Sequence, residues 1–536
     1  MKYLSSSQKI QWLLIGLLMI ISCIRITEKT NYFMDEITNF GIANNYNGFL
    51  MTISEGKKYV PSYMPFYDYL SVSEYNRFNY ENVYKNTAWD VHPPLYYDLL
   101  HTICSIFPET FSKWYAGFIN IVFIISTFII TYKLLYILPP VNKNNLSICL
   151  ILIIFIFSKG IANSTVFLRM YTMAMFWCTS LTYILIKDVL SENKINLRFF
   201  IALFFVALFG ALTHYYCIIF TVASCLIYGL IILKNKSFKK FFILVLSGIF
   251  SGLSAYILFP EMVKHMFTGY RGTESIENLN SSLQESLTRF QQYDEYIDIE
   301  LFGGLFLYIF SFSLCIILFL LIKKYVTKDL TYNIKKSTFI DSYFLIFLPV
   351  IIYFIFVGKS SVYITDRYMF PVFPLILAGY FSMFFALIDQ LFSKHKIYAV
   401  ILEILISILV IIFNYSNPKY KEEYMYKYTI PILENAKNHS DYDSLFIYDE
   451  NGIWNCYSSL LEATIYNSFT FINKSDLEIL PYLEISDNNK LAVFIPNNEN
   501  NILDVILETY PQYVNVEKNG SFWDYTSYFL SSDIFH

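Results

Sequence analysis

The chain has 536 residues, of which 55% are hydrophobic, 19% aromatic and only 15% charged. Because average soluble domains contain roughly 25% charged residues, this composition excludes an ordinary soluble globular protein and predicts an integral membrane protein. The formal net charge of −4 provides no overall basic field to attract nucleic acid, so we expect no nucleic-acid partner.

Apolar segments long enough to cross a bilayer recur through residues 1–415. A hydrocarbon core of about 30 Å needs about 20 residues of helix. Ile10–Cys23 could be a signal peptide, but no small-x-small cleavage site follows it, and we expect a retained first helix. The segments predict a polytopic α-helical bundle of about eleven transmembrane helices, at residues 9–24, 114–138, 146–163, 171–187, 198–213, 215–233, 241–259, 301–322, 338–357, 368–390 and 397–414.

A shorter apolar stretch, residues 94–107, carries Asp98 and His101 on one side and reads as an interfacial helix. If it lies on the surface, the lysine-rich loops share the side of Lys2 and Lys9, as the positive-inside rule requires. The predicted topology therefore has a cytoplasmic N-terminus, with lysine-rich loops around 187–198, 234–240, 323–336 and 394–396 also inside and with 25–113, 260–300 and 416–536 outside.

The outer segments differ in character. Loop 260–300 holds apolar residues three or four apart from Ile276 to Phe290, which predicts a helix that lies on the membrane or covers a cavity. Residues 416–536 contain two short apolar strands, 445–448 and 491–495, a helix at 502–509, and turns rich in Asn and Asp. They predict a soluble extracytoplasmic α/β domain.

Two adjacent carboxylates, Asp35 and Glu36, follow the first predicted helix at the outer surface of the membrane. Their flanks are aromatic and apolar, a setting that raises the pKa of a carboxylate toward that of a useful base. Neighbours in sequence do not face each other on a helix. We therefore expect one to act and the other to be a structural or ion-pairing partner, against the alternative of two solvated loop acids.

Four cationic or titratable residues fall on the same predicted face. His92 precedes two prolines at a helix start, where free N–H groups can bind phosphate. Arg169 and Arg367 lie at the outer ends of spans and His214 in a short outer turn. Arginine matches phosphate with two hydrogen bonds. These residues predict a phosphate site, against the alternatives of a structural turn and of arginines that reach lipid headgroups.

Other sequence motifs do not indicate a metal site or another enzyme class. Asp441-Tyr442-Asp443 has the spacing of a metal-binding DxD, but a lone match is weak and a polar turn is the better reading. No Gly-rich phosphate loop, HExxH or GxSxG string occurs, which removes the standard ATPase, zinc-protease and hydrolase interpretations. The eight cysteines include no CxxC pair, so neither a zinc site nor a disulfide framework is indicated.

Taken in chain order, the strings Asp35-Glu36, HPPLYY at 92–97, RMY at 169–171, THYY at 213–216 and DRY at 366–368 resemble those of a known family. This family is the bacterial branch of the protein O-mannosyltransferase-like glycosyltransferases, glycosyltransferase family 39 and its relatives, within the GT-C superfamily. The resemblance covers roughly residues 1–390 and leaves the tail outside.

The resemblance implies transfer of a sugar from a polyprenyl-phosphate carrier to an acceptor at the outer membrane face, with inversion at the anomeric carbon. Asp35 matches the acidic residue assigned as general base. Relatives often carry an acid shortly before the RMY arginine, where this chain reads NSTVFL at 163–168. Divalent-metal dependence is therefore left open, with Asp35 as the candidate ligand.

Two other classes of function also fit parts of the sequence. A transporter or flippase of lipid-linked sugars would need the same outer cations, but such proteins tend to show internal repeats and interrupted helices, and the sequence suggests neither. A catalytically inactive receptor is a third reading, against which the retained Asp35 argues. The expected partners are a polyprenyl-phosphate-linked sugar, membrane lipids, and a protein, wall polymer or lipid acceptor.

Overall fold

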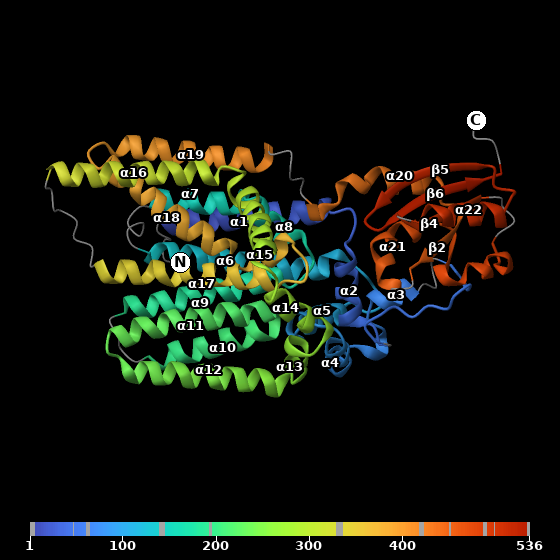
Figure 1. Ribbon diagram of the computed structural model, residues 1–536, viewed down its shortest axis with the longest axis horizontal. Coiled ribbons are helices and arrows are strands. Elements are labelled where there is room, and N and C mark those ends of the chain that lie inside the picture. The colour runs from blue at the N-terminus through green and yellow to red at the C-terminus, as the bar shows by residue number, and fades with distance from the viewer. Residues whose placement is uncertain are drawn as a thin grey trace.

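The computed structural model describes residues 6–46, 48–60, 65–138, 145–191, 196–327, 336–416, 423–449, 452–485, 490–497 and 499–532. A long helical bundle carries an α/β unit at one end, and short helices of the outer loops lie between the two (Figure 1). Lys2, Lys194 and the loop 328–335, which the topology prediction assigns to the cytoplasm, lie outside the described residues.

The bundle confirms a multi-pass α-helical membrane protein. Within the described ranges, eight stretches are long and apolar enough to cross a membrane singly. They belong to α1 (Ser6–Glu28), α6 (Lys113–Ile137), α9 (Tyr171–Leu190), α11 (Tyr215–Lys234), α12 (Phe238–Leu258), α17 (Lys336–Ser360), α18 (Phe373–Leu391) and α19 (Lys396–Ser416).

One predicted span, 146–163, is bent, and here the expectation of an uninterrupted helix is wrong, because α7 (Asn145–Phe157) meets α8 (Lys159–Val166) at 50°. A second bend lies at the start of the predicted span 301–322, where the stretch 283–302 meets α16 (Phe306–Thr327) at 80°. Counting each pair as one span gives up to ten spans in the described part of the chain. The eleventh predicted span is α10 (Leu197–Thr213), which is apolar but shorter than the others.

The second bend has a local cause that hydropathy does not reveal. Gly303 and Gly304 adopt φ of +68° and +87°, a left-handed conformation that glycine enters without steric cost. A Cβ on Gly303 would also lie 2.5 Å from the backbone nitrogen of Asn414 on α19. The chain therefore turns where two backbones touch, although the side chains on either side stay apolar.

The described part of loop 25–113, which is predicted to lie outside, contains four α-helices at the end of the bundle that faces the α/β unit, namely α2 (Met34–Asn44), α3 (Pro65–Leu70), α4 (Tyr80–Trp89) and α5 (Leu95–Ile106) (Figure 1). α5 packs against α2, with Tyr96, Tyr97 and Leu100 buried. It lies beside the end of the bundle and is not among its spans. Its position in the membrane interface stays a prediction.

Loop 260–300 contains α13 (Glu261–Phe267), α14 (Tyr270–Leu279) and α15 (Leu283–Ile297), so the single predicted helix is divided. The division falls at Ser282, whose side chain accepts from the N–H of Glu285 and forms a capping box. Tyr293 on α15 contacts the Ser361 hydroxyl at 2.7 Å, and Arg289 donates to the same hydroxyl at 2.8 Å. These bonds attach the loop to the outer end of α17.

The tail folds around a six-stranded sheet of order β1-β3-β2-β4-β6-β5, and the predicted strands and helix are confirmed. β2 pairs in parallel with β3 and β4, whereas β6 is antiparallel to β4 and β5. The tail elements are α20 (Ile430–Asn438), β2 (Asp443–Tyr448), α21 (Leu460–Ala463), β3 (Ser468–Asn473), β4 (Lys490–Pro496), α22 (Asn500–Thr509), β5 (Asn515–Phe522) and β6 (Tyr525–Ser531).

One edge of this sheet comes from the outer loop and was not predicted. β1 (Lys58–Tyr59) pairs antiparallel with β3, and Lys58 forms an ion pair of 2.8 Å with Asp443 on β2. The N–H of Gly56 adds a bond of 2.9 Å to the Phe471 carbonyl. The tail and the first outer loop therefore share one sheet.

The predicted sidedness can be tested with single cysteines in a variant that lacks the native eight. Glu517 on β5 and Lys239 at the start of α12 are both exposed. A membrane-impermeant maleimide should label Glu517→Cys in intact cells and Lys239→Cys only after permeabilisation. The opposite pattern would reverse the topology.

Candidate active site

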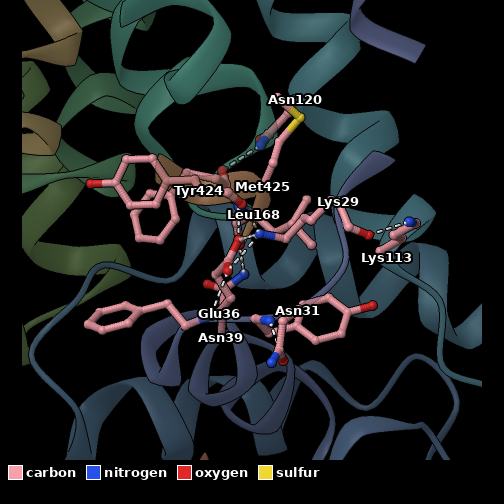
Figure 2. A network of polar contacts seen from close by, with 12 residues as sticks. Lys29, Asn31, Glu36, Asn39, Lys113, Asn120, Leu168, Tyr424 and Met425 are labelled. Atoms are coloured by element: carbon pink, nitrogen blue, oxygen red, sulfur yellow. Dashed lines mark hydrogen bonds and ion pairs between the residues drawn. The ribbon is translucent and has the colours of Figure 1, made fainter. Parts of the chain in front are cut away.

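The two carboxylates of α2 diverge, as expected for neighbours in a helix. Glu36 is fully buried and forms an ion pair of 2.9 Å with Lys29. Its oxygens also accept from the backbone N–H of Leu168 at 2.7 Å and of Phe33 at 2.8 Å (Figure 2). The carboxylate oxygens of Glu36 are thus occupied by bonds within the protein, and Glu36 has a structural role.

Lys29 has further partners in the segment that follows the last span. Its ammonium donates to the Tyr424 carbonyl at 2.6 Å and lies 4.6 Å from the ring centre of Tyr426. Burial lowers the pKa of Lys29 and raises the pKa of Glu36, against the opposing pull of the ion pair. Removing either partner would therefore leave the other in a dry environment.

The backbone turn before α9 is held by side chains from two other helices (Figure 2). Asn39 on α2 donates to the Leu168 carbonyl at 2.9 Å, and Asn120 on α6 donates to the Phe167 carbonyl at 2.7 Å. Together with Glu36, these amides satisfy buried backbone groups that no helix or sheet could pair. The turn is thereby fixed, and it presents Arg169.

Arg169 is 3% exposed and points toward the start of α2. It donates to the Asp35 backbone carbonyl at 2.8 Å and contacts Nε2 of His92 at 3.1 Å. Arginine can only donate, so Nε2 of His92 accepts, and the proton on Nδ1 is directed to Asp90 at 2.7 Å. His92 therefore orients Arg169. Nε of Arg169 has no hydrogen-bond partner among the described residues.

Arg367 is the direct partner of the Asp35 carboxylate, at 2.8 Å. Its guanidinium lies 5.4 to 5.6 Å from the ring centres of Phe33, Phe167 and Tyr368, within the range of cation–π attraction. Its Nε is also buried and without a partner in the described part of the chain. Arg169 and Arg367, which both bind Asp35, thus each have an Nε donor without a hydrogen-bond partner among the described residues.

The Asp366 side chain fixes the turn that carries Arg367. It accepts from the Arg367 backbone N–H at 2.7 Å and from the Tyr424 hydroxyl at 2.5 Å. The Tyr424 ring also packs on Phe167, with centroids 4.4 Å apart. A residue that follows the last span therefore joins the turns that carry the two arginines.

Asp35 retains 31% side-chain exposure and is surrounded by cations. Burial alone would raise its pKa, but Arg367, then Arg169 and His92, hold the pKa below its usual value. Arg271 on α14 contributes in the same direction, so the 260–300 loop brings a third guanidinium toward the site. In this state Asp35 is an ionised carboxylate.

His214 completes the predicted set. It is buried, its Nδ1 accepts from the Tyr216 N–H at 3.1 Å, and its ring lies 6.3 Å from that of His92. Burial, reinforced by His92 and Arg169, holds its pKa well below the usual value, so the imidazole is neutral. The predicted residues therefore gather in one place, with Asp35, Arg169, Arg367 and His92 in direct contact, Glu36 behind them and His214 beside them.

The surroundings of Asp35 do not fit a divalent cation. Its nearest charged partners are cations, and the described residues hold no group of three His, Cys, Asp or Glu that could bind a metal. The DxD acids separate, with Asp441 paired to Lys490 at 2.7 Å and Asp443 to Lys58. The charges around Asp35 therefore suit an anion better than a metal ion.

Comparison with known proteins identifies the fold. No protein-family model matches the sequence, and no curated protein matches it. The crystal structure of ArnT from Cupriavidus metallidurans bound to undecaprenyl phosphate is similar, with a TM-score of 0.53 over 98% of each chain at 7% identity. The protein has the GT-C fold that the sequence resemblance implied, and at this identity the likeness concerns the fold alone.

The anchoring role of Glu36 predicts a loss of stability on substitution. Glu36→Gln removes one charge of a buried ion pair, which typically costs about 3–5 kcal/mol, so the thermal unfolding temperature should fall markedly. Glu81→Gln is the matched control, because Glu81 pairs with Lys85 on an exposed helix surface and its loss should leave unfolding unchanged. Unaltered stability combined with lost activity would instead make Glu36 a reacting group.

Proposed function

We propose that this protein is a membrane glycosyltransferase that moves a sugar from a polyprenyl-phosphate-linked donor to an acceptor at the outer face of the cell membrane, with inversion. The observation that carries the proposal is one ionised carboxylate, Asp35, paired with the buried Arg367, while the buried Arg169 binds the Asp35 backbone carbonyl, at the end of a GT-C-type bundle. A phosphate leaving group and a hydroxyl nucleophile need these two kinds of group.

The arginines suit the phosphate of the donor. Arg169 and Arg367 are 3% and 9% exposed, and each keeps a buried Nε donor without a partner among the described residues. Charged hydrogen bonds to phosphate are strong, and in a site with little water they are stronger still. The crystal structure of ArnT holds undecaprenyl phosphate, which supports a lipid phosphate as the ligand here.

The ion pair between Asp35 and Arg367 offers a way to couple donor binding to base strength. A phosphate that takes hydrogen bonds from Arg367 would offset the cation that most lowers the pKa of Asp35. Asp35 would then become a better proton acceptor only when a donor is bound. This order protects the enzyme from activating a hydroxyl before there is a sugar to receive it.

The reaction is a single displacement. The acceptor oxygen forms a bond to the anomeric carbon as the bond from that carbon to the phosphate oxygen breaks. The proton of the hydroxyl passes to Asp35, and the electron pair of the broken bond stays on the phosphate, next to the arginines. Attack from the face opposite the leaving group inverts the anomeric centre. Glu36 and His92 position these groups.

A transporter or flippase of lipid-linked sugars is the second candidate, and one observation favours it. The two bent spans are the kind of interruption found in transporters. A transporter would move the donor intact, whereas a glycosyltransferase releases free polyprenyl phosphate. Release of that product from a labelled donor by the purified protein therefore separates the two functions.

Asp35→Asn provides the decisive test of the base. The change keeps the shape but removes the proton acceptor, and positioned proton transfer contributes about 10²–10⁴-fold, so turnover should fall at least 100-fold. Donor binding should survive, because Arg367 is freed and not lost. Asp68→Asn, at an exposed position on α3, should leave turnover unchanged. Near-normal turnover by Asp35→Asn would remove Asp35 as the base.

Arg169→Ala tests the phosphate site. A lost charge-assisted hydrogen bond costs about 1.5–3 kcal/mol, so donor affinity should fall by about one to two decades. Arg169→Lys should lie between, because it keeps the charge but not the two-pronged geometry. Binding can be measured by calorimetry with a short-chain polyprenyl-phosphate sugar. Unchanged affinity in both variants would show that Arg169 is not a donor ligand.

A further inference from the structure

The β5–β6 turn of the tail reaches the candidate active site. The Trp523 ring lies 4.5 Å from the ring of Phe33, and Phe33 in turn flanks the Arg367 guanidinium. Trp523 nevertheless remains 40% exposed. An indole from the far end of the chain thus stands one aromatic ring away from the Asp35 and Arg367 pair, with part of its surface uncovered.

The backbone around Trp523 is held in an unusual conformation. Its φ of +52° lies in the left-handed region, which side chains other than those of Gly, Asn and Asp rarely adopt. The Asn497 side chain donates to the Trp523 carbonyl, and the Asn497 N–H donates to the Asp524 carbonyl at 2.8 Å. The Thr526 hydroxyl secures the Asn497 amide at 2.7 Å. Trp523 and Asp524 are the two residues of the tight turn between β5 and β6, where a positive φ is regular, and these bonds hold the turn that presents the indole.

The chemistry beside this indole favours a saccharide. An exposed aromatic face can cover the C–H face of a sugar ring, and the neighbouring Asp524 carboxylate is exposed and can accept hydrogen bonds from hydroxyl groups. A lipid chain would gain nothing from that carboxylate. A glycosyl transfer at Asp35 also requires a hydroxyl-bearing acceptor to be held close to it.

We propose that Trp523 is the acceptor-side specificity residue, on whose indole a saccharide acceptor stacks while its hydroxyl is directed to Asp35. This inference rests on the proposed function and adds the chemical class of the acceptor. The tail then supplies one wall of the reaction site, and the bundle supplies the base and the phosphate ligands.

Binding can be tested without turnover. The full-length protein, labelled with 5-fluorotryptophan in nanodiscs free of sugar-headed detergent, should give one ¹⁹F resonance that disappears in Trp523→Phe. Chitobiose and maltose should shift that resonance, whereas a Ser/Thr-rich peptide and added phospholipid should not. The proposal is overturned if only the peptide or the phospholipid shifts the resonance, or if none of the four compounds does.

Kinetics provide the second test. Trp523→Ala should raise the KM for a saccharide acceptor about tenfold relative to the KM for the donor, with Trp523→Phe intermediate. Tyr482→Ala, at an exposed aromatic residue of the tail, is the control and should alter neither constant. A parallel rise of both constants would mean that Trp523 only supports Phe33. If the wild type releases no polyprenyl phosphate, the proposed function fails, while the resonance experiment still decides whether Trp523 binds saccharide.

Discussion

The buried ion pair of Glu36 and Lys29 joins three segments that are far apart in the sequence. Glu36 binds Lys29 after the first span, caps the start of α2 through Phe33, and accepts from Leu168 before α9. Lys29 carries the connection on to Tyr424, beyond the last span. Burying such a pair gains little net energy, so its main effect is geometric. Asp35 and Arg169 lie on segments that the network holds directly, and Arg367 is linked to it through Tyr424 and Asp366.

The charges of the proposed reacting groups are balanced differently from those of the buried Lys29–Glu36 pair. The Lys29 and Glu36 charges are matched and shielded from water, whereas Asp35 faces several cations and the arginines retain unused donors. The aromatic rings around Arg367 offset part of the desolvation of its charge. A bound anion would balance the remaining positive charge, which agrees with the proposed phosphate ligand.

The site residues that could be predicted from the sequence are charged residues within apolar or aromatic segments. Asp35, Arg169 and Arg367 interrupt apolar or aromatic surroundings, and that contrast is visible without a structure. Tyr424 and Trp523 could not be found in this way, because aromatic residues are common throughout this chain and their partners Lys29 and Phe33 lie hundreds of positions away. Their roles arise only when the tail folds back onto the bundle.

The same contrast applies to the fold. Strands β2 and β4 are short apolar runs, buried along most of their length, and were predicted. β5 is largely exposed and polar, and β1 has two residues, so neither gives a hydropathy signal. The bend at Gly303 was missed because the side chains around it remain apolar while the backbone changes direction. The bend beside Ser158 was missed because a hydropathy window averages Ser158 and Lys159 with the apolar run that precedes them.

The sheet shared by β1 and the tail also limits which segments of the protein can be exchanged with those of a relative. β1 precedes most of the spans in the chain, but its partner β3 follows all of the described spans, so the two strands can pair only after those spans have been made. A tail grafted from a relative would meet a foreign strand at that edge unless residues 55–59 were exchanged with it. Residues 55–59 and the tail should therefore be exchanged together when relatives are recombined.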